Sequence, residues 1–351
     1  MTAHHPSTVS VEVLIVGAGP IGLETAAVLR GEGRDVLVVD AGSIGSTIER
    51  TFPPETRFFT SPERLAIRGW PVTSPTQEKA TGEEYLAFLR AFATGAGLAV
   101  RTFSRVVGIS GQQGDFTVKI AALGGEEYFI HTQVLVLASG GMDTPRRLGV
   151  PGEDLPHVRS HLGDPHRYFG RTVAVVGGRN SAVEAALRLY RVGAHVHLIH
   201  REPELYTRVK PWIKPDMESL LAEGQIVGHL PAAIVQIGPG GVELRDLADD
   251  SGTQWISVDD VLLQIGFEQD SELFDLAGIE LTGPQRAPHV DTATLRSNVP
   301  GIYVVGTAIA GTQSGFKVFI ENSHQHADQV AAALAGRPAP NPVPARPLPE
   351  S

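Results

Sequence analysis

One pattern occurs twice in this sequence: an apolar segment, a glycine-rich turn and an alanine-rich amphipathic segment. The first copy is VEVLIVGAGPIGLETAAVL at residues 11–29, and the second is VAVVGGRNSAVEAAL at residues 173–187. In each copy the apolar segment predicts a buried strand, and the segment after the glycines predicts a helix. A further apolar strand follows each copy, at residues 35–40 and 195–200. Each copy is therefore typical of the strand–helix–strand unit that begins a nucleotide-binding domain.

The glycines of the first copy predict a dinucleotide-binding turn. Gly17, Gly19 and Gly22 fit the spacing G-x-G-x-x-G between a strand and a helix. Such a turn directs backbone N–H groups and the helix N-terminus at a pyrophosphate. Asp40 ends the next strand, 23 residues after Gly17, where a carboxylate can accept hydrogen bonds from a ribose. The alternative is an α/β domain that merely needs a tight turn here.

The second copy has the same geometry with different polar residues. Its first glycine is Gly177, and the residue 23 positions later is His200, which Arg201 follows. A basic pair in place of the acid favours the 2′-phosphate of NADPH, and Lys210 is near enough in sequence to assist. Arg179 stands where the second fingerprint glycine would be, so its side chain would crowd the pyrophosphate or grip it. The alternative is a decayed nucleotide site that is kept as a scaffold.

Two nucleotide sites of opposite character predict an electron-transfer protein with FAD in the first site and NADPH in the second. The expected fold class is α/β, with two Rossmann-like, three-layer domains, and the NADPH domain is inserted in a discontinuous FAD domain. We expect the FAD domain at residues 1–152 and 269–336 and the NADPH domain at 153–268, with a hinge in the Pro- and Gly-rich residues 148–156. The Pro-rich residues 337–351 predict a disordered tail.

Composition excludes several other classes of protein. The net charge of -10 leaves no basic stripe for a nucleic acid, and no apolar run approaches the roughly 20 residues that span a bilayer. The first ten residues, MTAHHPSTVS, lack the regions of a signal peptide, so a cytoplasmic protein is expected. Histidines and carboxylates show no metal-ligand spacing, so no metal is expected. The chain contains no cysteine, which excludes a redox dithiol on it.

Residues 10–336 resemble the thioredoxin-reductase-like flavoproteins. VLVLASGG at 134–141 resembles the segment that links the two domains in that group, and GVPGED resembles the hinge after it. Four stretches resemble one branch, the bacillithiol-disulfide reductases (bacilliredoxin reductases): RFFTSPERLAI (57–67), HLGDPHRYFGRTVAVVGGRNSAVEAAL (161–187), VKPWIKPDM (209–217) and KVFIENSHQHAD (317–328). The resemblance implies FAD, NADPH, a homodimer and the reduction of a low-molecular-weight disulfide or a bacilliredoxin-like protein.

The fingerprints and the resemblance together assign the cofactor-binding residues. Those expected at FAD are Gly17, Gly19, Pro20, Ile21, Gly22, Asp40, Ala41, Phe59, Thr60, Val106, Ala138, Ser139, Gly140, Gly306, Thr307, Phe319 and Ile320. Those expected at NADPH are Gly177, Arg179, Asn180, Ser181, Ala182, His200, Arg201 and Lys210. For Phe59, packing in the core is the alternative to packing on the flavin.

Three departures from the resemblance concern the redox chemistry. Thioredoxin reductases carry Cys-x-x-Cys before the second fingerprint, where this chain reads RSHLGDPHRY. The bacillithiol branch commonly has Cys after its first G-x-G-P, and here Ile21 stands instead. Thr307 occupies the position at which thioredoxin reductases place Asp to hold the ribityl chain. Because a thiolate relay cannot exist on this chain, electrons would pass directly from the flavin to the substrate.

Three histidines are candidate proton donors to a departing thiolate. His161 and His166 lie in the segment that replaces the dithiol, and His326 lies in the last helix, predicted at 319–335. In the related fold this helix points its N-terminus at the flavin. The pKa of a histidine lies near neutrality, which suits a proton donor. The alternative is that they are surface or hydrogen-bonded histidines without a catalytic role.

Three other functions are compatible with two dinucleotide fingerprints. A thioredoxin-reductase-like ferredoxin–NADP reductase would need a docking surface for an acidic partner, and a net charge of -10 offers no obvious one. A flavin-dependent monooxygenase usually carries F-x-G-x-x-x-H, which is missing. A redox or nucleotide sensor would bind flavin with negligible turnover. These readings differ in the oxidant that accepts the electrons.

Overall fold

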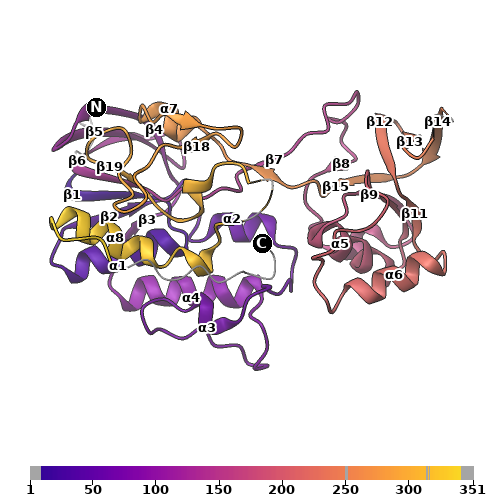
Figure 1. The fold of residues 1–351 in the computed structure, drawn as a ribbon, viewed down its shortest axis with the longest axis horizontal. Helices are drawn as coiled ribbons and strands as arrows, with labels where there is room; N and C mark the ends of the chain where they lie inside the picture. The colour runs from indigo at the N-terminus through magenta and orange to yellow at the C-terminus, as the bar shows by residue number, and fades with distance from the viewer. Residues whose placement is uncertain (1–8, 250–251, 314, 316, 341–351) are drawn as a thin grey trace. The chain divides into compact units, whose positions relative to one another are not determined.

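Each glycine turn belongs to a separate unit of the protein, and each unit has its own parallel sheet. The structure is a computed structural model that describes residues 9–249, 252–313, 315 and 317–340. The first unit contains the chain up to Thr144 and again from Glu268, and the second contains Pro145–Phe267. The chain passes between the units at β7 (Thr144–Pro145), which Figure 1 labels, and again at β16 (Phe267–Glu268). The second unit is therefore inserted in the first.

Two stretches with many prolines were predicted to be a hinge, at 148–156, and a disordered tail, at 337–351. The residues 148–156 lie inside the second unit. Residues 337–340 form neither helix nor strand, and the predicted tail from residue 341 onward lies outside the described residues.

The first unit has a seven-stranded sheet in the order β3-β2-β1-β6-β5-β4, and β19 pairs with β6. The parallel strands are β1 (Val9–Val16), β2 (Val36–Val39), β3 (Ala99–Arg101), β6 (Glu127–Leu137) and β19 (Ile302–Val304). The antiparallel strands are β4 (Ser104–Gln112) and β5 (Asp115–Ala122). Because β1 lies between β2 and β6, the glycine turn after β1 is at the centre of the carboxyl edge of the sheet.

Apolar side chains of the central strands point alternately to the two faces of this sheet, and each face is covered by a core. Val13 and Ile15 of β1 face a core formed with α1 (Pro20–Gly31), α4 (Gly82–Gly95) and α8 (Gln325–Leu334). Leu14 and Val16 face a second core formed with β4, β5 and α7 (Glu272–Leu276). The result is a three-layer arrangement around the sheet (Figure 1). The shorter elements are α2 (Ser46–Thr51), α3 (Pro62–Leu65), β17 (Leu281–Thr282), β18 (Ala287–Pro288), η2 (Gly306–Ala310) and η3 (Ile320–Asn322).

The second unit repeats this plan with a five-stranded parallel sheet in the order β11-β10-β9-β15-β8. Its strands are β8 (Val158–Arg159), β9 (Thr172–Val176), β10 (His195–Ile199), β11 (Val227–His229) and β15 (Asp260–Leu263). One face packs against η1 (Pro165–Tyr168), α5 (Asn180–Arg191) and α6 (Lys214–Ala222). The other packs against an antiparallel sheet of β12 (Ala232–Gly238), β13 (Gly241–Asp246) and β14 (Thr253–Ser257). The predicted α/β class is confirmed.

The last helix begins at Gln325 rather than at residue 319, so the predicted start is wrong. Before it, η3 forms a single short turn. The side chain of Asn322 accepts a hydrogen bond from the N–H of Phe319 at 2.8 Å. The hydroxyl of Ser323 donates to the carbonyl of Phe319 at 2.5 Å. Such local side-chain bonds to the backbone compete with the helical pattern, and they delay the helix here.

Candidate functional site

The turn between β1 and α1 is so tight that two of its glycines cannot carry a side chain. Gly17 has φ +116°, and a Cβ added there would lie 2.3 Å from the carbonyl oxygen of Ala138. A Cβ added to Gly22 would lie 2.0 Å from the carbonyl oxygen of Gly17. Gly19 differs, because a Cβ there would meet nothing within 4 Å. The turn thus packs closely on its protein side and leaves open space beside Gly19, at the helix N-terminus, where a phosphate is bound in such folds.

Asp40 is attached to this turn by its carboxylate. Its Oδ2 accepts a hydrogen bond from the N–H of Ala18 at 2.7 Å. Its Oδ1 accepts from the N–H of Gly42 at 2.8 Å and from the hydroxyl of Ser46 at 3.3 Å. A carboxylate oxygen has two acceptor positions, so Oδ2 keeps capacity for a further donor. Ala41, the next residue, is exposed. The acid is therefore fixed beside the glycine turn and can accept a bond from a ribose.

Two further loops meet at the same edge of the sheet, after β6 and after β19. A Cβ added to Gly140 would have the hydroxyl of Thr307 as its nearest contact, at 3.9 Å. The side chain of Gln269 joins the loops, because it donates to the carbonyl of Gly140 at 2.9 Å and to that of Ala308 at 2.8 Å. The hydroxyl of Ser139 is buried and has no hydrogen-bond partner among the described residues. A buried hydroxyl without a partner fits a site that a polar ligand completes.

Ile21 and Gly306 close the protein side of this edge. Ile21 is 5% exposed and belongs to the core beneath α1. Gly306 has φ +72°, and a Cβ added there would lie 3.3 Å from Ile21. The position after the first G-x-G-P therefore holds an aliphatic side chain packed against the backbone, with no group that could act as a nucleophile.

His326 holds the Gly306 loop from the last helix. Its Nδ1 accepts a hydrogen bond from the N–H of Gly306 at 2.9 Å, and the residue is 5% exposed. Burial, and then the charge of His324, lower the pKa of His326 to about 4. At neutral pH the ring is uncharged and has no imidazolium proton to supply. Its contact in the structure is with the backbone of the Gly306 loop.

The remaining residues expected at FAD have varied surroundings. Thr60 is buried, and the ammonium group of Lys79 lies 4.8 Å from the ring centroid of Phe59. Val106 is 6% exposed, and its side chain belongs to the core on the β4–β5 face of the sheet. Ile320 packs against the opposite core, and Phe319 precedes it at the start of η3.

In the second unit the turn after β9 is equally tight. Gly177 has φ +136°, and a Cβ added there would lie 2.4 Å from the carbonyl oxygen of Gln264. A Cβ added to Gly178 would lie 2.4 Å from the ring of His200. The imidazole thus packs on the turn itself. Burial lowers the pKa of His200, and the charges of Arg201 and Arg179 lower it while that of Glu202 raises it. Positive charge at neutral pH therefore comes from the arginines.

Arg179 and Arg201 present this positive charge in different ways. Arg179 is exposed at the start of α5, and its guanidinium lies 4.7 Å from the ring centroid of Tyr206. The N–H of Tyr206 in turn donates to the carbonyl of Gly178 at 3.0 Å. The side chain of Arg201 is 80% exposed, with an ion pair of 3.5 Å to Glu202. The side chain of Arg201 is therefore accessible to a ligand that binds at the turn, and Arg179 lies over the turn.

Lys210 is placed differently from the two arginines. It is 6% exposed, and its ammonium pairs with Glu184 of α5 at 3.1 Å. Its N–H donates to the side chain of Asn180 at 2.7 Å. Of the other residues expected at NADPH, Ser181 is exposed and Ala182 is buried in α5. The charge of Lys210 is compensated by Glu184, so it holds the loop after β10 to α5.

The three candidate proton donors lie in different units. His161 and His166 belong to the second unit and His326 to the first. The Nδ1 of His161 lies 2.9 Å from the hydroxyl of Ser160, and its ring packs against Phe267 with centroids 5.6 Å apart. His166 is exposed in η1.

Among the residues that the structure describes, no three His, Cys, Asp or Glu side chains gather as a metal site. In the same ranges, no helix is long and apolar enough to cross a membrane. Sequence patterns did not identify Gln269, because its partners lie 129 and 39 residues away along the chain.

Comparison with known proteins agrees with this geometry. Residues 14–306 match the family model described as pyridine nucleotide-disulphide oxidoreductase. The chain is 31% identical over 326 residues to bacilliredoxin reductase Bdr of Bacillus subtilis (strain 168), which covers 93% of this chain and 98% of that protein. It is 29% identical over 299 residues to a ferredoxin–NADP reductase of Ignicoccus hospitalis, over 84% of this chain and 89% of that one.

A solved structure extends the likeness to three dimensions. Bacillithiol disulfide reductase Bdr from Bacillus cereus superposes with a TM-score of 0.87 at 30% identity, over 93% of this chain and 99% of that one. The resemblance to the bacilliredoxin reductases that the sequence motifs indicated is confirmed. The family model spans both glycine turns. The chain therefore belongs to the pyridine nucleotide-disulphide oxidoreductase family, whose enzymes use a flavin and a pyridine nucleotide.

Proposed function

We propose that this protein is an FAD enzyme that uses NADPH to reduce a low-molecular-weight disulfide of the bacillithiol type, without a thiol of its own. The net reaction is NADPH + H⁺ + RSSR → NADP⁺ + 2 RSH, in which two electrons break the S–S bond. The observation that carries the proposal is the pair of glycine turns with opposite polar partners, Asp40 in one unit and Arg201 in the other. An acid suits a ribose diol and a guanidinium suits a phosphate.

The first unit fits FAD. The open space beside Gly19 accommodates a pyrophosphate at the N-terminus of α1, and Asp40 accepts a bond from the ribose. The partnerless hydroxyl of Ser139 would bond to the cofactor at the neighbouring loop. Thr307 offers a hydroxyl at the same edge. When bound, FAD supplies a ring that takes up a hydride and passes two electrons on.

The second unit fits NADPH. The exposed guanidinium of Arg201 would leave Glu202, its partner in an ion pair, and form hydrogen bonds to the 2′-phosphate instead. Arg179, over the turn, would contact the pyrophosphate. The neutral ring of His200 would support the turn on its protein side. We expect discrimination against NADH to come from Arg201.

The acceptor is expected to receive its electrons directly at the flavin. The chain has no cysteine, and Ile21 is buried where the bacillithiol branch commonly has one. The substrate disulfide must therefore bind beside the flavin ring. His161 and His166 are kept as candidates for protonating the leaving thiolate, since both rings are more accessible than that of His326. The homodimer and the cytoplasmic location stay predictions.

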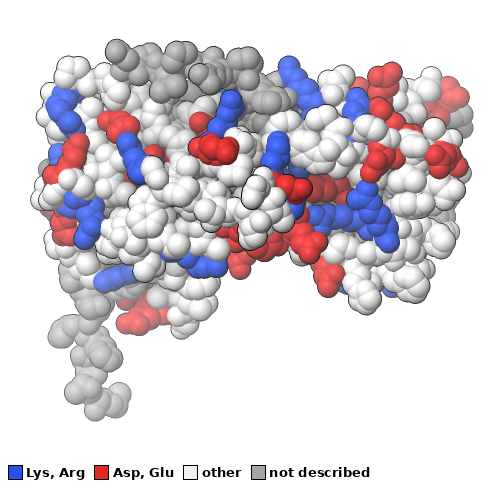
Figure 2. All heavy atoms as spheres, turned by 90° about the horizontal axis from the view of Figure 1, so that it is seen from below, with Lys and Arg blue, Asp and Glu red and all other residues white. Residues whose placement is uncertain are grey.

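A ferredoxin–NADP reductase is the second candidate. The 29% identity to the Ignicoccus hospitalis protein favours it, and electron transfer to ferredoxin requires no thiol. On the face drawn in Figure 2, Lys and Arg side chains are interspersed with Asp and Glu. The net charge of -10 offers no obvious docking surface for an acidic partner. We therefore place the disulfide first.

Anaerobic steady-state turnover distinguishes the candidates. FAD-loaded protein would be given NADPH with bacillithiol disulfide, a bacilliredoxin mixed disulfide or ferredoxin in separate assays, with oxygen as a fourth oxidant in air. The proposal predicts rapid NADPH consumption with a disulfide and formation of two thiols per NADPH. Turnover with ferredoxin or oxygen alone would contradict it and would favour the ferredoxin reductase or the monooxygenase.

A further inference from the structure

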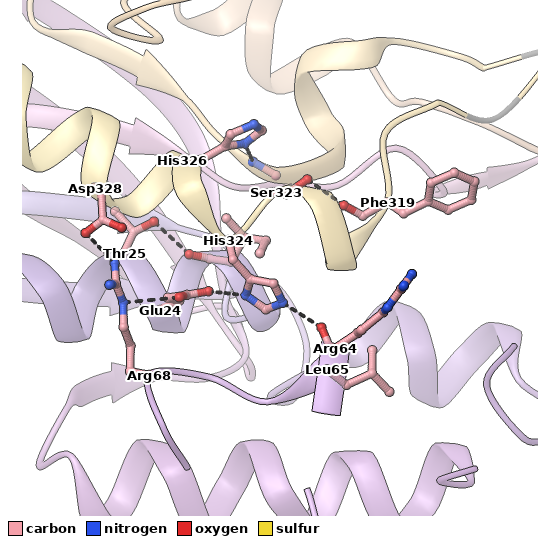
Figure 3. Close-up of polar contacts among 12 residues, drawn as sticks. Glu24, Thr25, Arg64, Leu65, Arg68, Phe319, Ser323, His324, His326 and Asp328 are labelled. Atoms are coloured by element: carbon pink, nitrogen blue, oxygen red, sulfur yellow. Dashed lines mark hydrogen bonds and ion pairs between the residues drawn. The ribbon is translucent and has the colours of Figure 1, made fainter. Parts of the chain in front are cut away.

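A buried carboxylate lies in the helix that follows the first glycine turn. Glu24 of α1 is 3% exposed, and one of its oxygens pairs with the Nε of Arg68 at 3.2 Å. Its other oxygen lies 2.5 Å from the Nδ1 of His324, as Figure 3 shows. Arg68 also pairs with Asp328 of α8 at 2.7 Å. We call these four residues the Glu24–His324 cluster. A carboxylate so deeply buried requires compensation by positive charge.

The ring of His324 has a hydrogen-bond acceptor at each nitrogen. The Nδ1 faces the carboxylate of Glu24 at 2.5 Å, and the Nε2 faces the carbonyl oxygen of Arg64 at 2.9 Å. A carbonyl oxygen can only accept a hydrogen bond. The carboxylate of Glu24, which is paired with the guanidinium of Arg68, also only accepts. Both ring nitrogens must therefore donate. Only the imidazolium form of His324 satisfies both contacts.

The electrostatic surroundings agree with this geometry. Burial lowers the pKa of His324. The hydrogen bond and charge of Glu24, the carbonyl of Arg64 and the charge of Glu321 together outweigh burial, so the pKa is raised overall. The titratable and charged groups facing the ring or its carboxylate partner are Glu24 of α1, Arg68, Tyr85 of α4, Glu321 of η3, and His326 and Asp328 of α8.

Two residues further on, His326 has the opposite chemistry. Its Nδ1 accepts from Gly306, which requires the neutral ring. A charged histidine, His324, thus attaches the start of α8 to Glu24 of α1 (Figure 3). A neutral histidine, His326, attaches it to the Gly306 loop. Ser323, which lies between η3 and His324, donates a hydrogen bond from its hydroxyl to the carbonyl of Phe319 at 2.5 Å. These bonds connect three segments expected at FAD.

We propose that His324 is a positioning residue of the flavin site: as an imidazolium bound to Glu24 and to the carbonyl of Arg64, it fixes the segment from Phe319 to the start of α8 against the fingerprint helix. This inference rests on the proposed FAD site. Nothing in it requires His324 to touch the cofactor. Loss of the ring proton would release one of its two contacts and loosen the segment.

The ring protonation can be read directly in the wild-type holoprotein. Two-dimensional ¹H–¹⁵N spectra of protein labelled at histidine nitrogens distinguish doubly protonated rings from each neutral tautomer. We expect one ring to stay doubly protonated at pH values where exposed histidines, with an ordinary pKa of about 6.5, are neutral. That signal should be missing in His324→Gln. Titration of His324 at or below the ordinary value would overturn the inference.

Flavin affinity provides the functional test. His324→Gln should bind FAD at least tenfold more weakly than wild type at pH 7. The wild-type affinity should fall as pH rises through the midpoint of the His324 ring, and the variant should lack this dependence. His289→Gln, at an exposed histidine of the same unit, is the matched control and should behave as wild type. Equal FAD affinity in wild type and His324→Gln would overturn the inference.

The outcomes separate this inference from the proposed function. If the wild-type chain bound no flavin, the proposed function would fail, whatever the ring spectra showed. If it bound FAD and turned over while His324 proved neutral, only the inference would fail. Should His324→Gln not fold, the wild-type ring titration and the pH dependence of wild-type FAD affinity still decide.

Discussion

The carboxylate of Asp40 accepts a hydrogen bond from the N–H of Ala18 at 2.7 Å, so the acid that follows β2 is attached to the glycine turn that follows β1. The turn, which would contact the diphosphate of an adenosine diphosphate, and the acid, which would contact its ribose, are therefore held together before a ligand binds. Such an arrangement lowers the ordering cost of binding.

Asp40→Ala is expected to yield protein with far less than one flavin per chain. The change removes the ribose acceptor and the bonds to Ala18 and Gly42, so the free energy of unfolding should also fall by about 1 kcal/mol or somewhat more. Flavin absorbance per protein after gel filtration measures the first effect, and denaturant unfolding measures the second. Asp35→Ala, at an exposed residue just before the same strand, is the control. Full flavin content in Asp40→Ala would refute the assignment.

Gly19→Ala tests whether a ligand occupies the space before α1. The backbone at Gly19 is extended, with φ -77° and ψ 179°, and an added Cβ would meet no protein atom within 4 Å. The apoprotein should therefore keep its stability to within about 0.5 kcal/mol, while FAD affinity falls roughly tenfold or more because the methyl group meets the pyrophosphate. Gly31→Ala, at the far end of α1 and equally unobstructed, should leave FAD affinity unchanged and should not lower stability, because Ala favours a helix over Gly. Unchanged FAD affinity in Gly19→Ala would mean that the pyrophosphate lies elsewhere.

Arg201→Ala should weaken the preference for NADPH over NADH. Loss of a charged hydrogen bond to the 2′-phosphate costs about 1.5 to 3 kcal/mol, so kcat/KM for NADPH should fall roughly 10- to 100-fold while that for NADH stays nearly constant. Arg191→Ala serves as the control, because Arg191 lies at the end of α5 in the same unit and pairs with Asp216. Equal losses with both nucleotides would contradict a role in recognising the phosphate.

The buried ring of His326 predicts a loss of stability in acid. Burial lowers the pKa of His326 to about 4, so the unfolded chain binds a proton that the folded chain rejects as pH falls below about 6.5. The contribution of His326 to folding is thus complete above pH 6.5 and is lost as pH falls towards 4, by up to about 3 kcal/mol. Unfolding of wild type and His326→Gln would be compared from pH 7 to pH 5. The stability difference between them should shrink on acidification; a constant difference would contradict the neutral buried ring.

The sequence predicted the parts of the fold that depend on local patterns. Both strand–glycine–helix units follow from apolar periodicity and glycine spacing, and their helices are observed at Pro20–Gly31 and Asn180–Arg191. The start of the last helix was wrong, because Asn322 and Ser323 bond to the local backbone. The antiparallel sheet of β12, β13 and β14 was not predicted, since its short strands are specified by pairing with each other.

The candidate site divides in the same way. The glycine turns and Asp40 were found because their spacing is set by one strand–helix–strand unit. Glu24 and His324 lie 300 residues apart in the sequence and meet only through tertiary packing. The neutral state of His326 also depends on burial and on Gly306, which no local pattern reveals.

Anaerobic titration with NADPH tests whether the reduced flavin passes its electrons straight to a disulfide. A chain without cysteine has no dithiol to store a second electron pair, so one equivalent of NADPH per flavin should bleach the flavin absorbance completely. Adding bacillithiol disulfide should then restore the oxidised spectrum within the turnover time and release two thiols per flavin. If the flavin stayed reduced with every disulfide and was reoxidised only by ferredoxin or oxygen, a disulfide would not be the acceptor.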